Sequence, residues 1–188
     1  ELLVNTYWQS HSLLLIKRAN RYLPQIEKIL REHQIPEDFK YIPLIESELT
    51  QAVSPAGAVG YWQFLKGTAK EYGLEVNSQV DERYSLEKST EAACKFFRES
   101  YEKFGSWTLA AASFNFGRSA LQRQMERQEA ESYYNLLLNQ ETARYIYRIL
   151  AMKTIMPDHE HYGLHVDDKD KYAPHNTRTL VVDTTIND

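Results

Sequence analysis

Apolar residues recur every three or four positions along most of the chain, as far as about residue 157. This spacing places them on one face of an α-helix, where they can pack against a core. The pattern predicts helices over about residues 13–30, 37–46, 61–72, 86–104, 107–116 and 142–156. Glycine or proline follows most of these segments, as is typical of helix ends. We therefore expect an all-α domain.

Two features interrupt the helical pattern. Pro43 lies inside the second predicted helix, and a proline there removes a backbone hydrogen bond, so we expect it to kink the helix or sharpen its end. Either effect would turn the side chain of Glu46 out of the helix and into a cleft. Residues 50–60 contain one proline and two glycines, which predict a loop.

The C-terminal residues 158–188 differ in character from the helical part. They are polar and include four histidines, and Thr179–Thr185 is the one segment with the pattern of a short strand. We expect a mostly irregular extension that packs on, or trails from, a domain of residues 1–157. The apolar run Leu180–Val182 is the reason to expect packing.

Composition limits the class of protein. The 188 residues, 43% of them hydrophobic and 12% aromatic, suffice for one domain with a sizeable core and are few for two. A formal net charge of -4 argues against a nucleic-acid partner, whose phosphates require a basic surface. No segment has the length of a membrane span, and no leader opens the chain. Any membrane association is therefore expected to depend on an anchor outside this segment.

The sequence offers no convincing site for a metal or cofactor. His159 and His161 are two residues apart with Asp158 and Glu160 beside them, which suits a pair of metal ligands in a strand or loop. Since no Cys or His partner recurs at structural-zinc spacing, a polar surface is the favoured interpretation. No phosphate-binding glycine loop is present, and the single Cys94 falls in an apolar helical pattern typical of a structural thiol. We expect neither a metal nor a cofactor.

Glu46 is the main candidate for catalysis. It follows the apolar run Tyr41–Ile45 and precedes the glycine-containing loop. A carboxyl group held against apolar side chains loses hydration of its charged form, so its pKa rises and it can act as a general acid near neutral pH. The alternative is a solvated carboxylate at a helix end. Glu48 is a poor second catalytic carboxylate, because residues two apart on a helix point to different sides.

Four motifs, in order along the chain, carry a family resemblance. They are Glu46-Ser47, Val53-Ser-Pro-Ala-Gly-Ala-Val-Gly-Tyr-Trp-Gln63, Ala111-Ala-Ser-Phe-Asn-Phe-Gly117 and Gln140-Glu-Thr-Ala-Arg-Tyr-Ile146. Together they resemble the lytic murein transglycosylases with a lysozyme-like catalytic domain, over about residues 30–157. Further positions are similar to the membrane-bound D subfamily, namely Gly60–Gln63, Asp81–Arg83, Ser89–Thr90 and Tyr133–Tyr134.

The resemblance implies an α-helical, lysozyme-like fold and a reaction on the glycan strands of peptidoglycan. Family members cleave the β-1,4 bond between N-acetylmuramic acid and N-acetylglucosamine without adding water, which leaves a 1,6-anhydromuramic end. Glu46 would protonate the leaving oxygen and then, as a carboxylate, take the proton of the muramic 6-hydroxyl. The resemblance also implies a bacterial envelope, with a periplasmic, lipid-anchored full-length protein and additional lysin-motif modules.

The resemblance assigns roles to further residues. Ser47 and Ser54 would bond the muramic substituents, although serines also form caps and turns routinely. Gln63 would contact the sugar amide, and Asn115 would line the site of an N-acetyl group. The hydroxyl of Tyr145 is expected to reach the catalytic glutamate and help to set its pKa.

Other motif residues are expected to be structural or to alter specificity. Glu141 is interpreted as an early-helix carboxylate favoured by the helix dipole. Phe114 stands where the family usually has tyrosine, so a phenol contact is lost while the ring packing is kept. Tyr61 and Trp62 stand where most relatives have leucine and methionine, which changes the groove wall and puts the preferred glycan in question.

Two other functions stay open from the sequence. A muramidase would share the fold and substrate but needs a positioned water and usually a second carboxylate, for which the motifs offer no good candidate. A peptidoglycan-binding module without turnover would have no need for a protonated glutamate.

Overall fold

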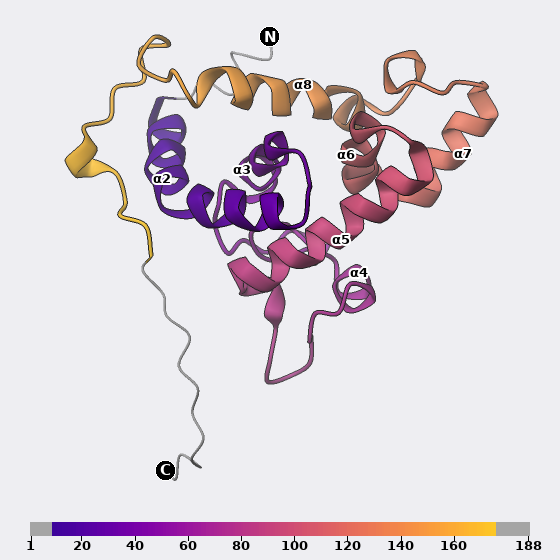
Figure 1. The fold of residues 1–188 in the computed structure, drawn as a ribbon, viewed down its shortest axis with the longest axis horizontal. Helices are drawn as coiled ribbons and strands as arrows, with labels where there is room; N and C mark the ends of the chain where they lie inside the picture. The colour runs from indigo at the N-terminus through magenta and orange to yellow at the C-terminus, as the bar shows by residue number, and fades with distance from the viewer. Residues whose placement is uncertain (1–8, 176–188) are drawn as a thin grey trace.

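Seven α-helices and four short 3-10 helices form the part of the chain that the computed structural model describes, residues 9–175 (Figure 1). The α-helices are α2 Gln9–Glu32, α3 Ile42–Ser47, α4 Lys66–Glu71, α5 Leu86–Phe104, α6 Trp107–Phe116, α7 Arg118–Gln128 and α8 Gln140–Ile155. The 3-10 helices are η1 Glu37–Tyr41, η2 Glu82–Tyr84, η3 Tyr133–Asn135 and η4 Asp168–Asp170. Within residues 9–175 the extended segments meet only in isolated bridges, so the predicted all-α class is confirmed.

Helix α5 crosses the middle of the molecule and packs against α2 on one side and α6 on the other (Figure 1). Helix α6 in turn contacts α7 and α8, and α3 packs against α8. Aromatic rings fill the space between them: Phe114 of α6 contacts Trp62, Phe64 and Phe97 with ring centroids 5.0–6.1 Å apart. The centroid separations suit the edge-to-face and tilted arrangements that aromatic pairs prefer.

Local capping explains why several helices begin and end where the sequence indicates. Ser85, Ser106 and Asn139 each accept a hydrogen bond from a backbone N–H of the first turn that follows them, in α5, α6 and α8 respectively. Gly105 ends α5 in the left-handed region, with φ 65°. These three helices therefore match the predicted segments to within two residues.

Two predicted helices were partly wrong. The segment predicted as one helix over 37–46 is η1 followed by α3, and Pro43 lies in the first turn of α3. A proline there breaks no helical hydrogen bond, so the expected kink is absent. The helix predicted from residue 61 begins only at Lys66, because residues 61–65 form turns and Phe64 bridges to Val59.

Residues 158–175 run along the outer side of α2 (Figure 1). The backbone of Tyr172 accepts a hydrogen bond from Asn20 Nδ2 (3.0 Å) and donates one to Lys17 O (3.3 Å). Leu164 and Val166 are buried in a small cluster that includes two aliphatic side chains of the helical body. The expected strand and apolar run within residues 179–185 lie outside the described residues.

Within residues 9–175, no helix has the length and apolar character needed to cross a membrane. Cys94 is buried in α5, and this burial raises the pKa of its thiol to about 12.

Candidate active site

A pocket of about 430 Å³ lies where the end of α3, the loop over residues 53–65, the end of α6 and the first turns of α8 meet. It brings together five of the six predicted site residues, from positions that are far apart in the sequence. They are Glu46, Ser54, Gln63, Asn115 and Tyr145.

Glu46 stands in the last turn of α3. The helix ends at the next residue, Ser47, because Glu48 and Leu49 adopt left-handed backbone angles with φ 53° and 55°. Glu46 Oε1 accepts a hydrogen bond of 2.6 Å from the hydroxyl of Tyr145. Burial is the largest influence on Glu46 and raises the pKa of its carboxyl above the ordinary value.

Three neighbours adjust that shift. The hydrogen bond from Tyr145 and the positive charge of Arg148 both lower the pKa of Glu46, because they stabilise the carboxylate. The negative charge of Glu141 acts in the opposite direction. Burial outweighs the two lowering influences, so the pKa stays raised, which favours a protonated acid.

Tyr145 is the buried residue that donates the hydrogen bond to Glu46. It lies on α8 and is only 1% exposed. Burial, and then the neighbouring charge of Glu46, raise the pKa of its phenol well above the ordinary value. The hydroxyl therefore keeps its proton and can donate it in the hydrogen bond to Glu46.

Gln63 and Asn115 present amide groups to the pocket. Gln63 Nε2 donates to the backbone oxygens of Ala52 (3.0 Å) and Gly60 (2.9 Å). With both N–H groups engaged, the amide oxygen of Gln63 is the part left to accept a bond from a ligand. Asn115 is also held in place on both sides of its amide.

Two residues from the first turn of α8 hold Asn115. Its Nδ2 donates to Glu141 Oε1 (2.9 Å), and its Oδ1 accepts from Thr142 Oγ1 (2.8 Å). Because a single orientation satisfies both bonds, they fix which end of the amide faces each neighbour.

The two predicted serines differ in position. Ser54 lines the pocket, and its Oγ accepts a bond from the N–H of Ala58 (3.0 Å), which stabilises the loop. Ser47 is 6% exposed and does not line the pocket. Its hydroxyl donates toward the backbone oxygens of Pro43 (3.1 Å) and Tyr61 (2.8 Å). These bonds stabilise the turn after α3, and a substrate contact by Ser47 stays a prediction.

Two charged residues of α8 also line the pocket, although the sequence had not assigned either of them to a site. Glu141 was expected to be structural, yet it is a second carboxylate in the same pocket as Glu46. Arg148 was not singled out at all. Its position three residues after Tyr145 was the available signal, because residues three apart share a helix face.

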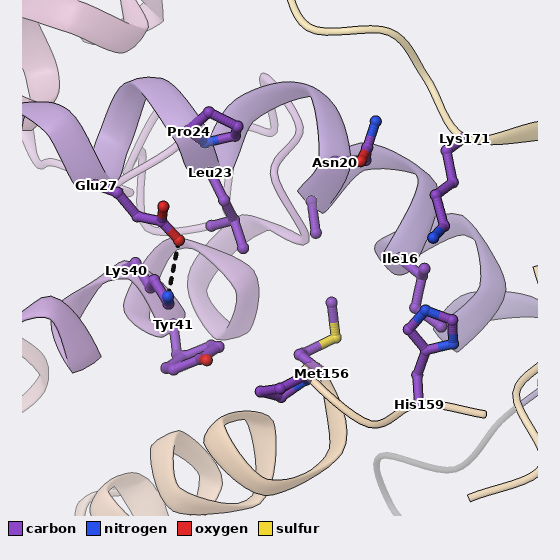
Figure 2. Close-up of a pocket in the computed structure, with 12 residues that line it drawn as sticks. Ile16, Asn20, Leu23, Pro24, Glu27, Lys40, Tyr41, Met156, His159 and Lys171 are labelled. Atoms are coloured by element: carbon purple, nitrogen blue, oxygen red, sulfur yellow. Dashed lines mark hydrogen bonds and ion pairs between the residues drawn. The ribbon is translucent and has the colours of Figure 1, made fainter. Parts of the chain in front are cut away.

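A second pocket, of about 370 Å³, lies between α2, η1 and the C-terminal segment (Figure 2). Its one carboxylate belongs to Glu27, which accepts a bond of 2.7 Å from the ammonium of Lys40. That carboxylate is held by a cation of the same chain, whereas the carboxyl of Glu46 is buried and bonded to a phenol hydroxyl. The pocket around Glu46 is therefore the better candidate for acid catalysis.

No group of three potential metal ligands comes together within residues 9–175. His159, one of the two histidines considered above, has its Nδ1 2.7 Å from the carbonyl oxygen of Leu164. This contact stabilises the turn at residues 159–164.

A family profile described as the Transglycosylase SLT domain matches residues 24–137. The chain is 29% identical over 160 residues to the membrane-bound lytic murein transglycosylase D of Escherichia coli strain K12, covering 82% of this chain and 35% of that protein. The protein of the same name from Escherichia coli O6:H1 matches with the same identity and coverage.

The matched range contains Glu46, Gln63 and Asn115, whereas Tyr145 follows its end. The chain spans 35% of the length of the two relatives. Since the family profile covers more than half of the chain, and the helical architecture agrees with it, the chain belongs to the transglycosylase SLT domain family.

Proposed function

We propose that this chain is the catalytic domain of a peptidoglycan lytic transglycosylase. It cleaves the β-1,4 bond between N-acetylmuramic acid and N-acetylglucosamine without water and leaves a 1,6-anhydromuramic end. The observation that carries the proposal is the pairing of a buried Glu46, whose pKa is raised, with the hydroxyl of Tyr145 at 2.6 Å in a pocket lined by amides. The family membership and the names of the two relatives support it.

In the first step, protonated Glu46 donates its proton to the glycosidic oxygen. The bond from that oxygen to C1 of the muramic residue breaks, and the N-acetylglucosamine side leaves as an alcohol. Positive charge develops at C1 while Glu46 becomes a carboxylate. The hydroxyl of Tyr145 stabilises this carboxylate without having to move, which is the usual way a prearranged site lowers a barrier.

In the second step, the 6-hydroxyl oxygen of the muramic residue bonds to C1, and its proton passes to the Glu46 carboxylate. The attacking group belongs to the same sugar, so proximity favours the reaction over attack by an external molecule. No water is consumed, and Glu46 returns to its protonated form for the next cycle. One carboxyl group therefore serves as acid and then as base.

Uncharged groups of the pocket bind the substrate. Gln63 accepts a hydrogen bond from a sugar amide through its free oxygen, and Asn115 lines the position of an N-acetyl group. Ser54 faces the muramic substituents from the loop. Amide and hydroxyl groups suit a glycan, whose own polar groups are hydroxyls and acetamides.

The full-length protein is proposed to act in a bacterial cell envelope, on peptidoglycan glycan strands. The printed name of the relatives, "membrane-bound", supports this setting. A periplasmic location, a lipid anchor and lysin-motif modules outside this segment belong to the same proposal. Residues 1–157 form the catalytic domain and 158–188 an extension, which the contacts of residues 158–175 with α2 support.

A muramidase is the alternative that one observation favours. Glu141 lines the same pocket as Glu46 and offers the second carboxylate that hydrolysis usually requires. Glu141 nevertheless accepts a hydrogen bond from Asn115, so we assign it the role of orienting that amide. For this reason we favour the transglycosylase over the muramidase.

The test is mass spectrometry of the soluble products from purified murein sacculi. The wild type should release fragments one water lighter than reducing muropeptides, and Glu46→Gln should release none. Glu48→Gln is the matched control, since Glu48 lies outside the pocket and pairs with His11 and Arg18. Reducing ends would point to hydrolysis and to Glu141, while no release by the wild type would favour a binding module.

A further inference from the structure

Arg148 lies in the Glu46 pocket without a carboxylate partner. Within residues 9–175 its guanidinium makes one hydrogen bond, from Nη2 to Ile45 O (3.2 Å), and no ion pair. Arginine has five N–H donors, so most of its donor capacity is left for a ligand. The side chain is half-buried, which makes an unpaired charge costly in the free protein.

The buried and partly buried arginines outside the pocket are balanced in two ways. Arg21 and Arg98 bond to backbone oxygens, whereas three others pair with a carboxylate. Arg83 bonds to Asp81 at 2.7 Å, Arg118 to Glu99 at 2.6 Å, and Arg18 lies 3.6 Å from Glu48. In each case a carboxylate of the same chain balances the guanidinium. Arg148 instead faces a pocket that is open to a substrate, so an incoming anion is the natural source of its counter-charge.

The charge of Arg148 also acts against the proposed acid while the pocket is empty. It lowers the pKa of Glu46, which reduces the protonated fraction that the first step requires. An anion bound to the guanidinium would cancel part of this influence once the substrate is in place. The unpaired charge is then a disadvantage only in the free protein.

The proposed substrate carries a suitable anion. N-acetylmuramic acid differs from N-acetylglucosamine by a lactyl ether, whose carboxylate is free in peptide-free strands. In peptide-bearing strands that carboxyl is an amide, and the stem peptide supplies carboxylates instead. A guanidinium matches either carboxylate with two parallel N–H donors.

Resting on the proposed function, we propose that Arg148 binds a carboxylate carried by the muramic residue, through its lactyl group or its stem peptide, and so selects strands that bear this charge. Arg148 is then a specificity residue on α8, one turn beyond Tyr145. It distinguishes muramic acid from the uncharged sugar next to it, which amides alone would do poorly.

The experiment compares pairs of soluble glycan strands that differ only in charge. One pair is peptide-free strands with free lactyl carboxylates and the same strands converted to methylamides. The other is peptide-bearing strands before and after the same conversion. The readout is the ratio of kcat/KM within each pair, measured on one enzyme preparation, so that the fraction of folded enzyme cancels.

We expect the wild type to favour the charged member of one pair by about 10- to 100-fold, the effect of hydrogen bonds to a charged group. Arg148→Gln should bring that ratio to about 1, and Arg148→Lys should keep part of it, because lysine retains the charge without the planar fork. Arg144→Gln, which removes an exposed arginine of α8 outside the pocket, should keep the wild-type ratio.

The outcomes distinguish the two possible sources of the carboxylate. They also distinguish failure of this inference from failure of the proposed function. A ratio lost in the peptide-free pair assigns the lactyl carboxylate, and one lost in the peptide-bearing pair assigns the stem peptide. Wild-type ratios near 1 in both pairs overturn the inference, as does an Arg148→Gln variant that loses rate equally on all strands, since that reflects only its bond to Ile45. A wild type that yields no anhydro product on any strand instead refutes the proposed function itself.

Discussion

Tyr145→Phe tests the acid chemistry most directly. The change removes the hydroxyl that donates to Glu46 Oε1 at 2.6 Å and keeps the ring, which is 1% exposed in the core. It therefore separates the hydrogen bond from the packing. The variant should fold, because the phenylalanine ring fills the same space.

The magnitude follows from the kind of bond that is lost. A hydrogen bond to a charged group contributes about 1.5–3 kcal/mol, and each 1.4 kcal/mol corresponds to about tenfold in rate. The carboxylate is only partly formed when the glycosidic bond breaks, so part of this energy is lost from the transition state. We expect kcat to fall by roughly 10- to 30-fold.

The pH dependence has a definite sign. The bond from Tyr145 stabilises the carboxylate and lowers the pKa of Glu46, so its removal raises that pKa further. A general acid must be protonated, and activity is therefore lost as the pH rises through its pKa. The alkaline limb of the pH profile of kcat/KM should move to higher pH in Tyr145→Phe.

The assay is release of anhydromuropeptides from soluble strands, followed by mass spectrometry across the pH range. Tyr147→Phe is the matched control, because Tyr147 is an exposed residue of the same helix and does not line the pocket. Tyr147→Phe should have the kcat of the wild type, and the alkaline limb of its pH profile should lie at the same pH. An alkaline limb that stays in place or moves to lower pH in Tyr145→Phe would refute the reasoning.

Three further predictions follow from the same structure. Glu141→Gln removes a negative charge that raises the pKa of Glu46, so the alkaline limb should move to lower pH in the same assay, and movement to higher pH would contradict this. Gly60→Ala should cost about 2–3 kcal/mol of unfolding free energy, since φ is 79° and a Cβ would overlap a backbone carbonyl oxygen. Gly57→Ala, with φ 80° and open space, should cost about 1 kcal/mol, and equal melting temperatures of the two variants would count against steric overlap. Deleting residues 158–188 should lower the melting temperature in calorimetry, because two buried aliphatic side chains contribute about 1.5–3 kcal/mol each, and an unchanged value would show that the extension adds nothing.

Helices whose information is local were predictable from the sequence. Helix α5 has an apolar face at helical spacing, a serine cap before its first residue and Gly105 after its last, and all of these act within a few residues. The predicted segments for α6 and α8 succeeded for the same reason. Helix α7 was not singled out, because its sequence is polar and only Leu121 is buried.

The errors lie where distant contacts decide the backbone. Residues 61–65 have no local signal against a helix, yet Gly60 lies against the backbone of Arg83, and Trp62 is fully buried with its Nε1 bonded to Thr90 Oγ1 (2.9 Å). These contacts hold the segment in turns. The position of Ser47 away from the pocket could not be predicted for a similar reason, because its bond to Tyr61 O depends on how that loop packs against α3.

By itself, the sequence determined the helical class and the set of candidate residues. Periodicity, helix caps and motif order depend only on residues that are close together in the chain. Only the tertiary structure decided which candidates share a pocket. Glu46 and Tyr145 are 99 residues apart, and their 2.6 Å contact exists because α3 packs against α8. The same packing places Arg148 in the pocket of Glu46. The pKa of the Glu46 carboxyl is set by burial and by nearby charges, and these come from several segments that only the fold brings together.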